Sequence, residues 1–574
     1  MEKTNNEKKK KSKTTARLKT LILTDTADKA KTLRKLLGRQ YQVISSDGFL
    51  RDLPKTQIGI DPENDFEPKY ITVRGKGKLL EQIRKESLNA RRIFALTDES
   101  DEGEAIAYHY SELFGINPSS KFRITIKEMT KKFLKSAFDN SRSINMSMIN
   151  SFEASRAVQR LFIFNLNPIL WHKIYRGISI NLNQSLILRL ICEQEKKLQN
   201  LPPRITIDEL KEKWNSPLTW KTLQLFAAYE LNLHTGLTSL ISKQLYEGVN
   251  INKTCTGLIT YHKHGEILIS SENHSPEELK EYLTPAQLNL YTLIWKHFNK
   301  EEIDFSKSLK SLNRYDDFML MLELEDKGIA WEQSFSISVC GMMKRKYIEL
   351  TDNGYKPTEL GLNIAQVLKD YFSTITASKS LIKVENQIKS VAEGDTDKLE
   401  VMEIFYKQLS NAVNKAVEKI GEDLTPKEEP SIETDEICDK CGRKMVIRRS
   451  RYGMFLACSG YPECKNSKPY FEKLEETCPK CGGHLLRRKW NKGRKFYSCE
   501  NYQTCDFSTW DEPQNRTCNT CGSTLFLHTF KDRAPMLYCG NEQCPTRKEH
   551  PINLIIQKAK KNAETKRQKK NQKK

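Results

Sequence analysis

Short apolar runs alternate with helix-like patterns in the N-terminal part of the chain. A buried strand is predicted at residues 20–25, and a helix should follow it to about Leu37 and stop at Gly38. Further strand-like runs lie at Tyr41–Ser45, Arg92–Thr97 and Phe122–Ile126, and helical patterns follow the last two. This alternation predicts a compact α/β domain with a largely parallel sheet over about the first 140 residues.

The middle of the chain is mostly helical in pattern. Residues 145–200 and 341–422 read as helical, and residues 201–340 mix helical with extended segments. The helices expected in the mixed part are Leu223–Ala228, Thr238–Tyr246 and Pro285–Phe298. A polar stretch with two prolines, Glu422–Glu436, predicts a linker. With 574 residues, 38% of them apolar, the chain should form several folded domains.

Twelve of the 15 cysteines form three copies of one pattern, a Cys-x-x-Cys pair with a second pair about 17 residues later. The copies are Cys438, Cys441, Cys458 and Cys464; Cys478, Cys481, Cys499 and Cys505; and Cys518, Cys521, Cys539 and Cys544. Four thiolates at this spacing predict a tetrahedral Zn2+ site, so we expect three zinc ribbons. The alternative, a set of disulfides, needs an oxidising compartment. The lysine-rich start has no apolar segment, so we expect a cytoplasmic, nucleoid-associated protein that is neither exported nor membrane-spanning.

The formal charge of +21 is concentrated at the two ends of the chain. Residues 1–19 and 558–574 hold +14 of it, so these basic tails are expected to be disordered arms suited to polyanions. Three tetrathiolate zinc sites lower the charge further, which leaves a nearly neutral folded body. Basic tails alone support only non-specific phosphate binding, and they can equally be solvated tails without a partner.

Five carboxylates follow the predicted strand at Arg92–Thr97, in the sequence LTDESDEGE from Leu96. Ligands bind at the carboxyl ends of strands in open α/β sheets, and crowded carboxylates there favour a divalent cation such as Mg2+. The alternative is a solvated acidic helix start, which the helix dipole favours.

A series of motifs occurs in the same order as in bacterial type IA DNA topoisomerases. They are LILTDTADKAKTL from Leu21, SDGFLRDLP from Ser46, GIDPENDF from Gly59, TDESDEGEAIA from Thr97, RGIS from Arg176, QS at Gln184, QLYE from Gln244, GLITY from Gly257, PTELG from Pro357 and ACSGYP from Ala457. The chain therefore resembles this family over roughly residues 20–550. The resemblance implies a Toprim α/β domain, a toroidal core and three C-terminal zinc ribbons, each with four cysteine ligands. It also implies ATP-independent cleavage of one DNA strand, strand passage and religation through a 5′-phosphotyrosyl intermediate, which relaxes negatively supercoiled DNA.

The same resemblance assigns roles to individual residues. Tyr261 would be the nucleophile, Lys29 and Lys263 would supply positive charge, and Asp25 would act as an acid or through metal. The expected Mg2+ ligands are Asp25, Asp98 and Glu102, with Asp101 as an additional candidate. The expected DNA-binding residues are Phe49, Arg51, Arg156, Arg160, Arg176, Ser179, Asn183, Gln184 and Lys263.

Several positions depart from the family pattern, mostly at groups that contact metal or phosphate. Ser100 replaces an acidic residue, and Asp101 replaces the usual arginine. Other departures are Asp25 for glutamate, Phe49 for histidine, Ser155, Gln159, Asn181 and Leu182 in the helical DNA-binding part, and Lys263 for arginine. Two interpretations follow, a divergent working topoisomerase and a relative without cleavage activity that binds single-stranded nucleic acid, DNA or RNA. A Toprim nuclease or primase is a third.

The ribbons suit both main interpretations because cations and aromatic rings lie between their cysteine pairs. These residues are Arg448, Arg449, Arg451, Tyr452 and Phe455; Arg487, Arg488, Lys489, Trp490, Phe496 and Tyr497; and Phe526, Phe530, Lys531, Arg533 and Tyr538. Such rings either stack on unpaired bases or cover the zinc sites.

The expected organisation is a monomer with eight consecutive parts. They are a basic tail at 1–19, the Toprim domain at 20–142, a core at 143–422 with the hinge and tyrosine-bearing domain around 232–320, a linker at 423–436, zinc ribbons at 437–470, 477–511 and 517–550, and a basic tail at 558–574.

Overall fold

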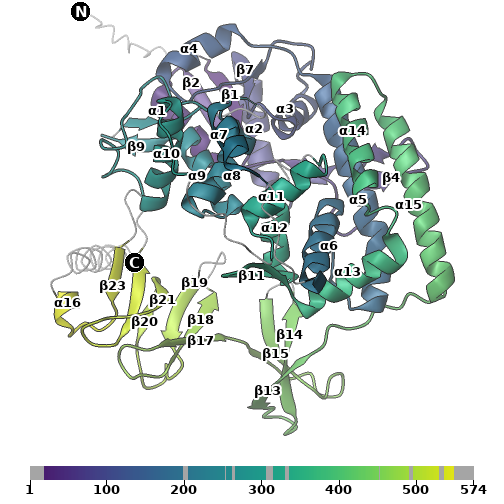
Figure 1. The fold of residues 1–574 in the computed structure, drawn as a ribbon, viewed down its shortest axis with the longest axis vertical. Helices are drawn as coiled ribbons and strands as arrows, with labels where there is room; N and C mark the ends of the chain where they lie inside the picture. The colour runs from purple at the N-terminus through teal and green to yellow at the C-terminus, as the bar shows by residue number, and fades with distance from the viewer. Residues whose placement is uncertain are drawn as a thin grey trace, which may run out of the picture. The chain divides into compact units, whose positions relative to one another are not determined.

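The computed structural model describes residues 18–197, 205–252, 254–260, 265–305, 314–329, 335–450, 453–489, 495–528 and 536–548. The chain divides into two compact units, Met1–Lys280 with Ala286–Glu428, and Glu281–Pro285 with Glu429–Lys574 (Figure 1). Tyr261, Lys263 and nearly all of the two basic tails lie outside the described residues.

A four-stranded parallel sheet forms the N-terminal domain of the first unit. Its strands are β1 (Thr20–Thr24), β2 (Tyr41–Ser45), β7 (Arg92–Leu96) and β8 (Arg123–Ile124), in the order β2-β1-β7-β8. The apolar runs therefore predicted the first three strands closely. β8 is shorter than the predicted run at Phe122–Ile126.

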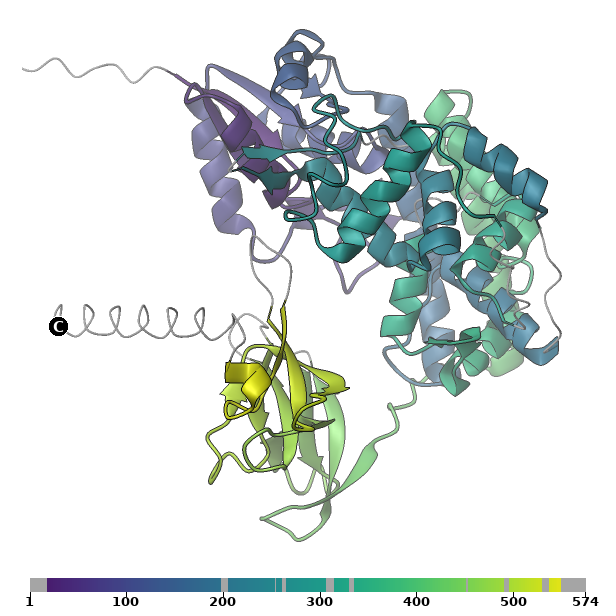
Figure 2. The same ribbon diagram turned by 60° about the vertical axis from the view of Figure 1, so that its left-hand side comes forward.

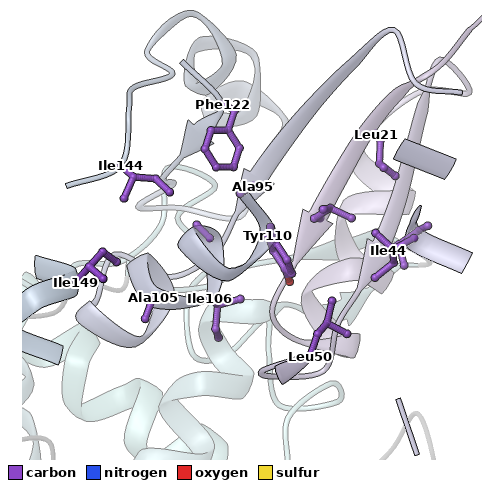
Figure 3. Close-up of a cluster of buried hydrophobic side chains, with 13 residues drawn as sticks. Leu21, Ile44, Leu50, Ala95, Ala105, Ile106, Tyr110, Phe122, Ile144 and Ile149 are labelled. Carbon is purple, nitrogen blue, oxygen red and sulfur yellow. The ribbon is translucent and has the colours of Figure 1, made fainter. Parts of the chain in front are cut away.

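Helices and short strands surround this sheet. The helices are α1 (Ala27–Leu36), α2 (Gly77–Leu88), α3 (Asp101–Phe114) and α4 (Lys131–Asp139), and two short ladders pair β3 (Arg51–Asp52) with β6 (Ile71–Thr72) and β4 (Ile60–Asp61) with β5 (Glu67–Pro68). Figure 3 shows the apolar core between sheet and helices, where Tyr110 of α3 lies among Leu50, Ile106 and Ala95. The Tyr110 hydroxyl donates to the Thr24 carbonyl at 3.1 Å, so the core fixes the end of β1.

Long helices make up much of the rest of the first unit. They are α5 (Met146–Lys173), α6 (Leu182–Lys197), α13 (Glu359–Phe372), α14 (Ser378–Glu393) and α15 (Lys398–Ile420). α5 packs against α3, α14 and α15, which joins the N-terminal domain to the helical part (Figure 1). The helical pattern at 145–200 is thereby confirmed.

A mixed segment connects α6 to α13. It contains α7 (Ile207–Asn215), α8 (Trp220–Leu231), α9 (Thr235–Glu247), β9 (Val249–Ile251), β10 (Thr254–Thr256), α10 (Pro285–Phe298), α11 (Asp317–Asp326), α12 (Phe335–Lys344), β11 (Ile348–Thr351) and β12 (Gly354–Pro357). The three helices predicted here are confirmed. The hairpin β11–β12 interrupts the part predicted to be helical, because Thr351-Asp352-Asn353-Gly354 forms a turn in which Gly354 has a φ of 104°.

Three small antiparallel sheets form the second unit, coloured green to yellow in Figures 1 and 2. The first contains β13 (Ile432–Ile437), β14 (Lys444–Ser450), β15 (Gly453–Cys458) and β16 (Ser467–Pro469). The second contains β17 (Glu472–Thr477), β18 (His484–Lys489), β19 (Lys495–Cys499) and β20 (Ser508–Thr509). The third contains β21 (Glu512–Thr517), β22 (Thr524–His528) and β23 (Met536–Cys539), with α16 (Pro545–Lys548) after it.

The first strand of each small sheet begins before the predicted ribbon. β13 lies largely in the stretch predicted to be a linker, and that part of the linker prediction is wrong. Most β13 side chains are exposed, so the strand carries no alternating apolar pattern that would reveal it in the sequence. Among the described residues, no helix is long and apolar enough to cross a membrane.

Candidate functional site

A buried lysine lies between two aspartates at the carboxyl edge of the parallel sheet. β1 and β7 are neighbours with Thr24 opposite Leu96, so Asp25 and Asp98, which follow these strands, come together. Lys29 lies in the first turn of α1, and its Nζ is 2.7 Å from Asp25 Oδ1 and 2.5 Å from Asp98 Oδ1. The Lys29 side chain is 0% exposed. We call these three residues the Lys29 centre.

The two aspartates of the Lys29 centre differ in their proton affinity. Burial opposes ionisation of Asp25, but the Lys29 ammonium outweighs it and holds the pKa of Asp25 at about 2. Burial raises the pKa of Asp98, Lys29 offsets this only in part, and the negative charge of Asp25 raises it further. Asp25 is therefore the ionised partner of Lys29, and Asp98 takes up a proton more readily.

The acidic stretch after β7 separates into side chains with different tasks. Ser100 is the N-cap of α3, and its Oγ accepts a hydrogen bond from Gly103 N at 3.0 Å. Glu104 is fully buried and pairs with Arg123 at 3.1 Å and Arg142 at 2.7 Å. The expectation that all five carboxylates share the sheet edge is therefore wrong for Glu104, which binds two arginines that come from later in the chain.

The remaining acidic groups do not form a ready Mg2+ site. Among the described residues, only the three sets of four cysteines bring three or more donor atoms within 4.8 Å of one another. Asp25 and Asp98 both point at the Lys29 ammonium, and the Glu102 side chain is exposed in the first turn of α3. The expected set of Asp25, Asp98, Glu102 and Asp101 is thus not assembled around a common point, and these residues do not fit a preformed Mg2+ site.

The segment that leads to Tyr261 is bound to the N-terminal domain. Gly257 N donates to the carbonyl of Met129 at 3.2 Å, and Leu258 N donates to the carbonyl of Leu245 at 2.7 Å. Thr260, the last described residue before Tyr261, donates its N–H to the carbonyl of Leu268 at 2.9 Å. The chain on both sides of residues 261–264 is therefore held in place.

Glu247, at the end of α9, makes two further contacts between this segment and α1. Its Oε1 accepts the Thr26 hydroxyl at 2.6 Å, and its carbonyl accepts the Thr32 hydroxyl at 2.6 Å. Thr26 is the N-cap of α1, the helix that carries Lys29. Sequence reasoning did not assign a role to Glu247, Thr26 or Thr32, although all three lie within the quoted motifs.

Four of the predicted DNA-binding residues lie beside an aromatic cluster near the start of α5. The Phe49 and Phe152 rings stack at 5.8 Å, and the Arg156 guanidinium lies 5.6 Å from each ring. Arg51 lies over the ring of Tyr70 at 5.3 Å.

The two α5 arginines also make polar contacts with the loops of the N-terminal domain. Arg156 pairs with Asp52 at 2.5 Å, and Arg160 Nε donates to the carbonyl of Ile58 at 2.9 Å. The two α5 arginines are thus fixed against the loops at residues 52–58.

The other predicted DNA-binding residues surround the start of α6. Gln184 is buried, and its Nε2 donates to the carbonyl of Ser338 at 3.4 Å, which indicates a structural role. The Ser179 carbonyl accepts Arg345 Nη1 at 2.7 Å, Asn183 is half-buried, and the Arg176 side chain is exposed. Leu182, one of the departures, is buried, and its N–H donates to Gln159 Oε1 at 3.2 Å. Leu182 and Gln159, two positions that depart from the family pattern, are thus hydrogen-bonded to each other.

The twelve predicted zinc ligands meet in three groups of four. In each group the Sγ atoms lie within 4.8 Å of one another. Sγ pairs such as Cys441–Cys458 at 3.2 Å and Cys481–Cys499 at 3.3 Å are too long for disulfides. Backbone N–H groups of Gly460 and Asn501 donate to cysteine sulfurs at 3.3 Å, as suits thiolates. These donor sets fit Zn2+.

The ribbons differ in where their aromatic rings point. Tyr461 of the first ribbon is 57% exposed, and Tyr502 and Trp510 of the second are 54% and 44% exposed. Arg448 lies 5.7 Å from the Tyr461 ring, and Arg488 lies 4.4 Å from the Tyr502 ring.

Phe526 and Tyr538 of the third ribbon are instead buried at 1% and 7% exposure. They pack with Leu485, Cys499 and Cys505 of the second ribbon in one apolar cluster. The sequence left open whether the ribbon aromatics stack on unpaired bases or cover the zinc sites. Phe526 and Tyr538 cover the zinc sites.

Comparison with known proteins identifies two of these parts and the fold. Residues 20–129 match the model of the Toprim domain, and residues 435–472 and 475–514 match the topoisomerase DNA binding C4 zinc finger. The structure is similar to that of full-length topoisomerase I from Thermotoga maritima, with a TM-score of 0.62 and 22% identity over 78% of this chain and 97% of that chain. The resemblance to bacterial type IA topoisomerases is thereby confirmed, and the chain has a topoisomerase I-like fold with a Toprim domain and topoisomerase-type zinc ribbons.

Proposed function

We propose that this chain, with its topoisomerase I-like fold, is a type IA DNA topoisomerase that cleaves and rejoins one strand through Tyr261. The observation that carries this proposal is the attachment of the tyrosine-bearing segment to α1. Glu247 binds Thr26, the N-cap of the helix that holds Lys29, and Thr32 within that helix, which supports a position of the segment that leads to Tyr261 close to the Lys29 centre.

The proposed chemistry is a transesterification. The Tyr261 Oη attacks a backbone phosphorus, and the new O–P bond forms as the bond from phosphorus to the 3′ oxygen breaks. The phenolic proton leaves to water, and the leaving 3′ oxygen takes a proton. The reverse step restores the strand, and no nucleotide is hydrolysed because the phosphotyrosyl bond conserves the bond energy.

We assign the proton donor for the 3′ oxygen to Asp98 rather than to Asp25. The pKa of Asp25 is held at about 2 by Lys29 against the effect of burial, so Asp25 carries no proton at neutral pH. Asp98 lies in the same centre and has a raised pKa, chiefly through burial, which suits an acid. Lys29 supplies positive charge to this edge, and Lys263 would supply more beside the phosphate.

The proposed partner is a single-stranded region of negatively supercoiled DNA. Arg51, Arg156 and Phe49 combine cations with stacked rings near the Toprim edge, and Tyr461 and Tyr502 offer exposed rings beside arginines on the ribbons. Such surfaces grip backbone phosphates and stack on unpaired bases. DNA as the partner, with RNA as the alternative, a monomeric state and a place at the nucleoid in the cytoplasm remain predictions.

A 3′-end-labelled single-stranded oligonucleotide tests the proposed cleavage. After incubation and denaturation, we expect a slow-migrating adduct that protease shortens, since the protein would be joined to the 5′ end of the labelled fragment. The matched control is Tyr261→Phe, which should lose the adduct and keep oligonucleotide binding. Wild-type protein that binds tightly but gives no adduct contradicts the proposal.

A second candidate function is binding of single-stranded nucleic acid without cleavage. The observation that favours it is the Lys29 centre itself, in which the ammonium is already bonded to two aspartates. The same gel separates the candidates, because a binder gives a native complex and no adduct. Cleavage products without attached protein would point to a nuclease.

A further inference from the structure

We infer that the Lys29 ammonium replaces a divalent cation at the Toprim edge, so that this chain has no dedicated Mg2+ site and its cleavage and religation run without Mg2+. The second half of this inference rests on the proposed function. The first half concerns only the residues of the Lys29 centre and is testable by itself.

The position between the two aspartates is already taken by a cation. Lys29 Nζ contacts Asp25 at 2.7 and 3.0 Å and Asp98 at 2.5 Å, and it is closed off from solvent. Carboxylates that face one another repel unless a positive group lies between them. The ammonium meets this need, and a divalent ion at the same edge would have to displace it or lie next to it.

Two other polar side chains near this edge already have structural partners. Ser100 is uncharged, and its Oγ accepts the hydrogen bond from Gly103 N that caps α3. Glu104 is fully buried in its pairs with Arg123 and Arg142. Mg2+ needs oxygen ligands in near-octahedral geometry and gives up its water reluctantly, so two aspartates shared with a lysine are a poor site for it.

Backbone packing also restricts how the acidic loop can rearrange around an ion. A Cβ on Gly103 would lie 2.1 Å from the Asp98 carbonyl, so the start of α3 is in close contact with the end of β7. Arg123 Nη2 donates to the same carbonyl at 2.7 Å. The backbone of Asp98 is therefore held from both sides.

Binding of Mn2+ as a spin probe tests the first half of the inference. The full zinc-loaded chain is titrated with Mn2+, and free Mn2+ is followed by electron paramagnetic resonance. We expect no one-to-one site in the wild type. In Ser100→Asp we expect a one-to-one site whose Mn2+ affinity is about 10- to 100-fold above the weak, non-stoichiometric binding of the wild type, the scale on which groups at a metal site change affinity.

Ser100→Asp suits this test because aspartate caps helices as well as serine does, so the fold is kept. Lys29→Met is the second variant, and it should also gain Mn2+ affinity because it leaves two facing carboxylates without a cation. A wild-type site that binds Mn2+ one-to-one and is lost in Asp98→Asn would overturn the inference, whatever the activity.

The second half is tested with the same labelled oligonucleotide in buffer passed over a chelating resin, without free chelator, so that the ribbons keep zinc. We expect the adduct, and religation after a shift to high salt, to be unchanged when Mg2+ is added. Adduct or religation that occurs only with Mg2+ contradicts the inference. Absence of adduct in both buffers contradicts the proposed function, and the Mn2+ titration still decides whether the edge holds a divalent ion.

Discussion

The Toprim edge and the zinc ribbons gather negative donors in opposite ways. At the edge, two aspartates face a lysine from the same domain, and the third position of the family pattern is a serine that caps a helix. In each ribbon, four cysteine sulfurs face one another within 4.8 Å. Aspartates that share a lysine need no metal to stay close together, whereas thiolates that face only one another do. The difference separates a centre in which two aspartates share a lysine from three metal-dependent ones.

Loss of one zinc ligand should have the largest effect. In Cys499→Ser, the second ribbon loses a thiolate and hence its metal, and structural zinc contributes about 10–16 kcal/mol in small domains, more than a ribbon can otherwise supply. Because Phe526 and Tyr538 pack on this ribbon, the third ribbon should also lose stability. Zinc content per chain and limited proteolysis measure both effects.

Cys192→Ser is the matched control, since Cys192 is a buried cysteine of α6 that belongs to none of the three groups. It should keep all three zinc ions. Full zinc content and protease resistance in Cys499→Ser would break the comparison, because the second ribbon would then keep its metal and its fold without the full set of four thiolates.

Removal of the buried charge at Glu104 should have the next largest effect. Glu104→Gln leaves Arg123 fully buried without a counter-charge, and breaking such a pair typically destabilises by about 3–5 kcal/mol. Burial opposes ionisation of Glu104, but the arginines outweigh it and hold its pKa below the ordinary glutamate value. The stabilisation is therefore present above the unfolded-state pKa and is lost as pH falls through the folded-state value.

Urea unfolding of the first unit at neutral pH, followed by its helix signal, measures the Glu104 effect. Glu112→Gln provides the control in the same helix, because the Glu112 side chain is exposed and its change should stay within about 0.5 kcal/mol. Equal unfolding midpoints for the two variants would show that Glu104 is as dispensable as a surface carboxylate.

What the sequence could predict follows from how local each signal is. The strands β1, β2 and β7 are largely buried, so short apolar runs predicted them. In the structure, the parallel pairing of β1 with β7 brings Asp25 next to Asp98. Cysteine spacing alone predicted the three zinc groups. β13 was not predicted, because most of its side chains are exposed and the strand therefore has no apolar face.

The fate of the acidic stretch could not be read from the sequence. Glu104 is turned away by Arg123 and Arg142, which lie 19 and 38 residues further along the chain. The contacts of Glu247 with Thr26 and Thr32 span 221 and 215 residues. Pairings over such separations depend on the folded arrangement of whole helices and strands, which no local pattern encodes.

The smallest predicted effect separates the two roles that Ser100 could have at the edge. As the N-cap of α3, Ser100 accepts one hydrogen bond, so Ser100→Ala should lower the free energy of unfolding by about 0.5–2 kcal/mol. Ser100→Asp should leave it nearly unchanged without metal, because aspartate can accept the same bond and its charge suits a helix N-terminus. The urea unfolding midpoints of Ser100→Ala and Ser100→Asp, each compared with that of the wild type, measure these two changes in stability.

Added Mg2+ sharpens the comparison further. It should stabilise only Ser100→Asp, since a ligand that binds the folded state alone raises its stability. Stabilisation of the wild type by the same Mg2+ concentration would mean that the edge accepts a divalent ion despite Lys29. The lysine-bridged edge and the zinc ribbons would then differ only in how tightly they bind a metal ion.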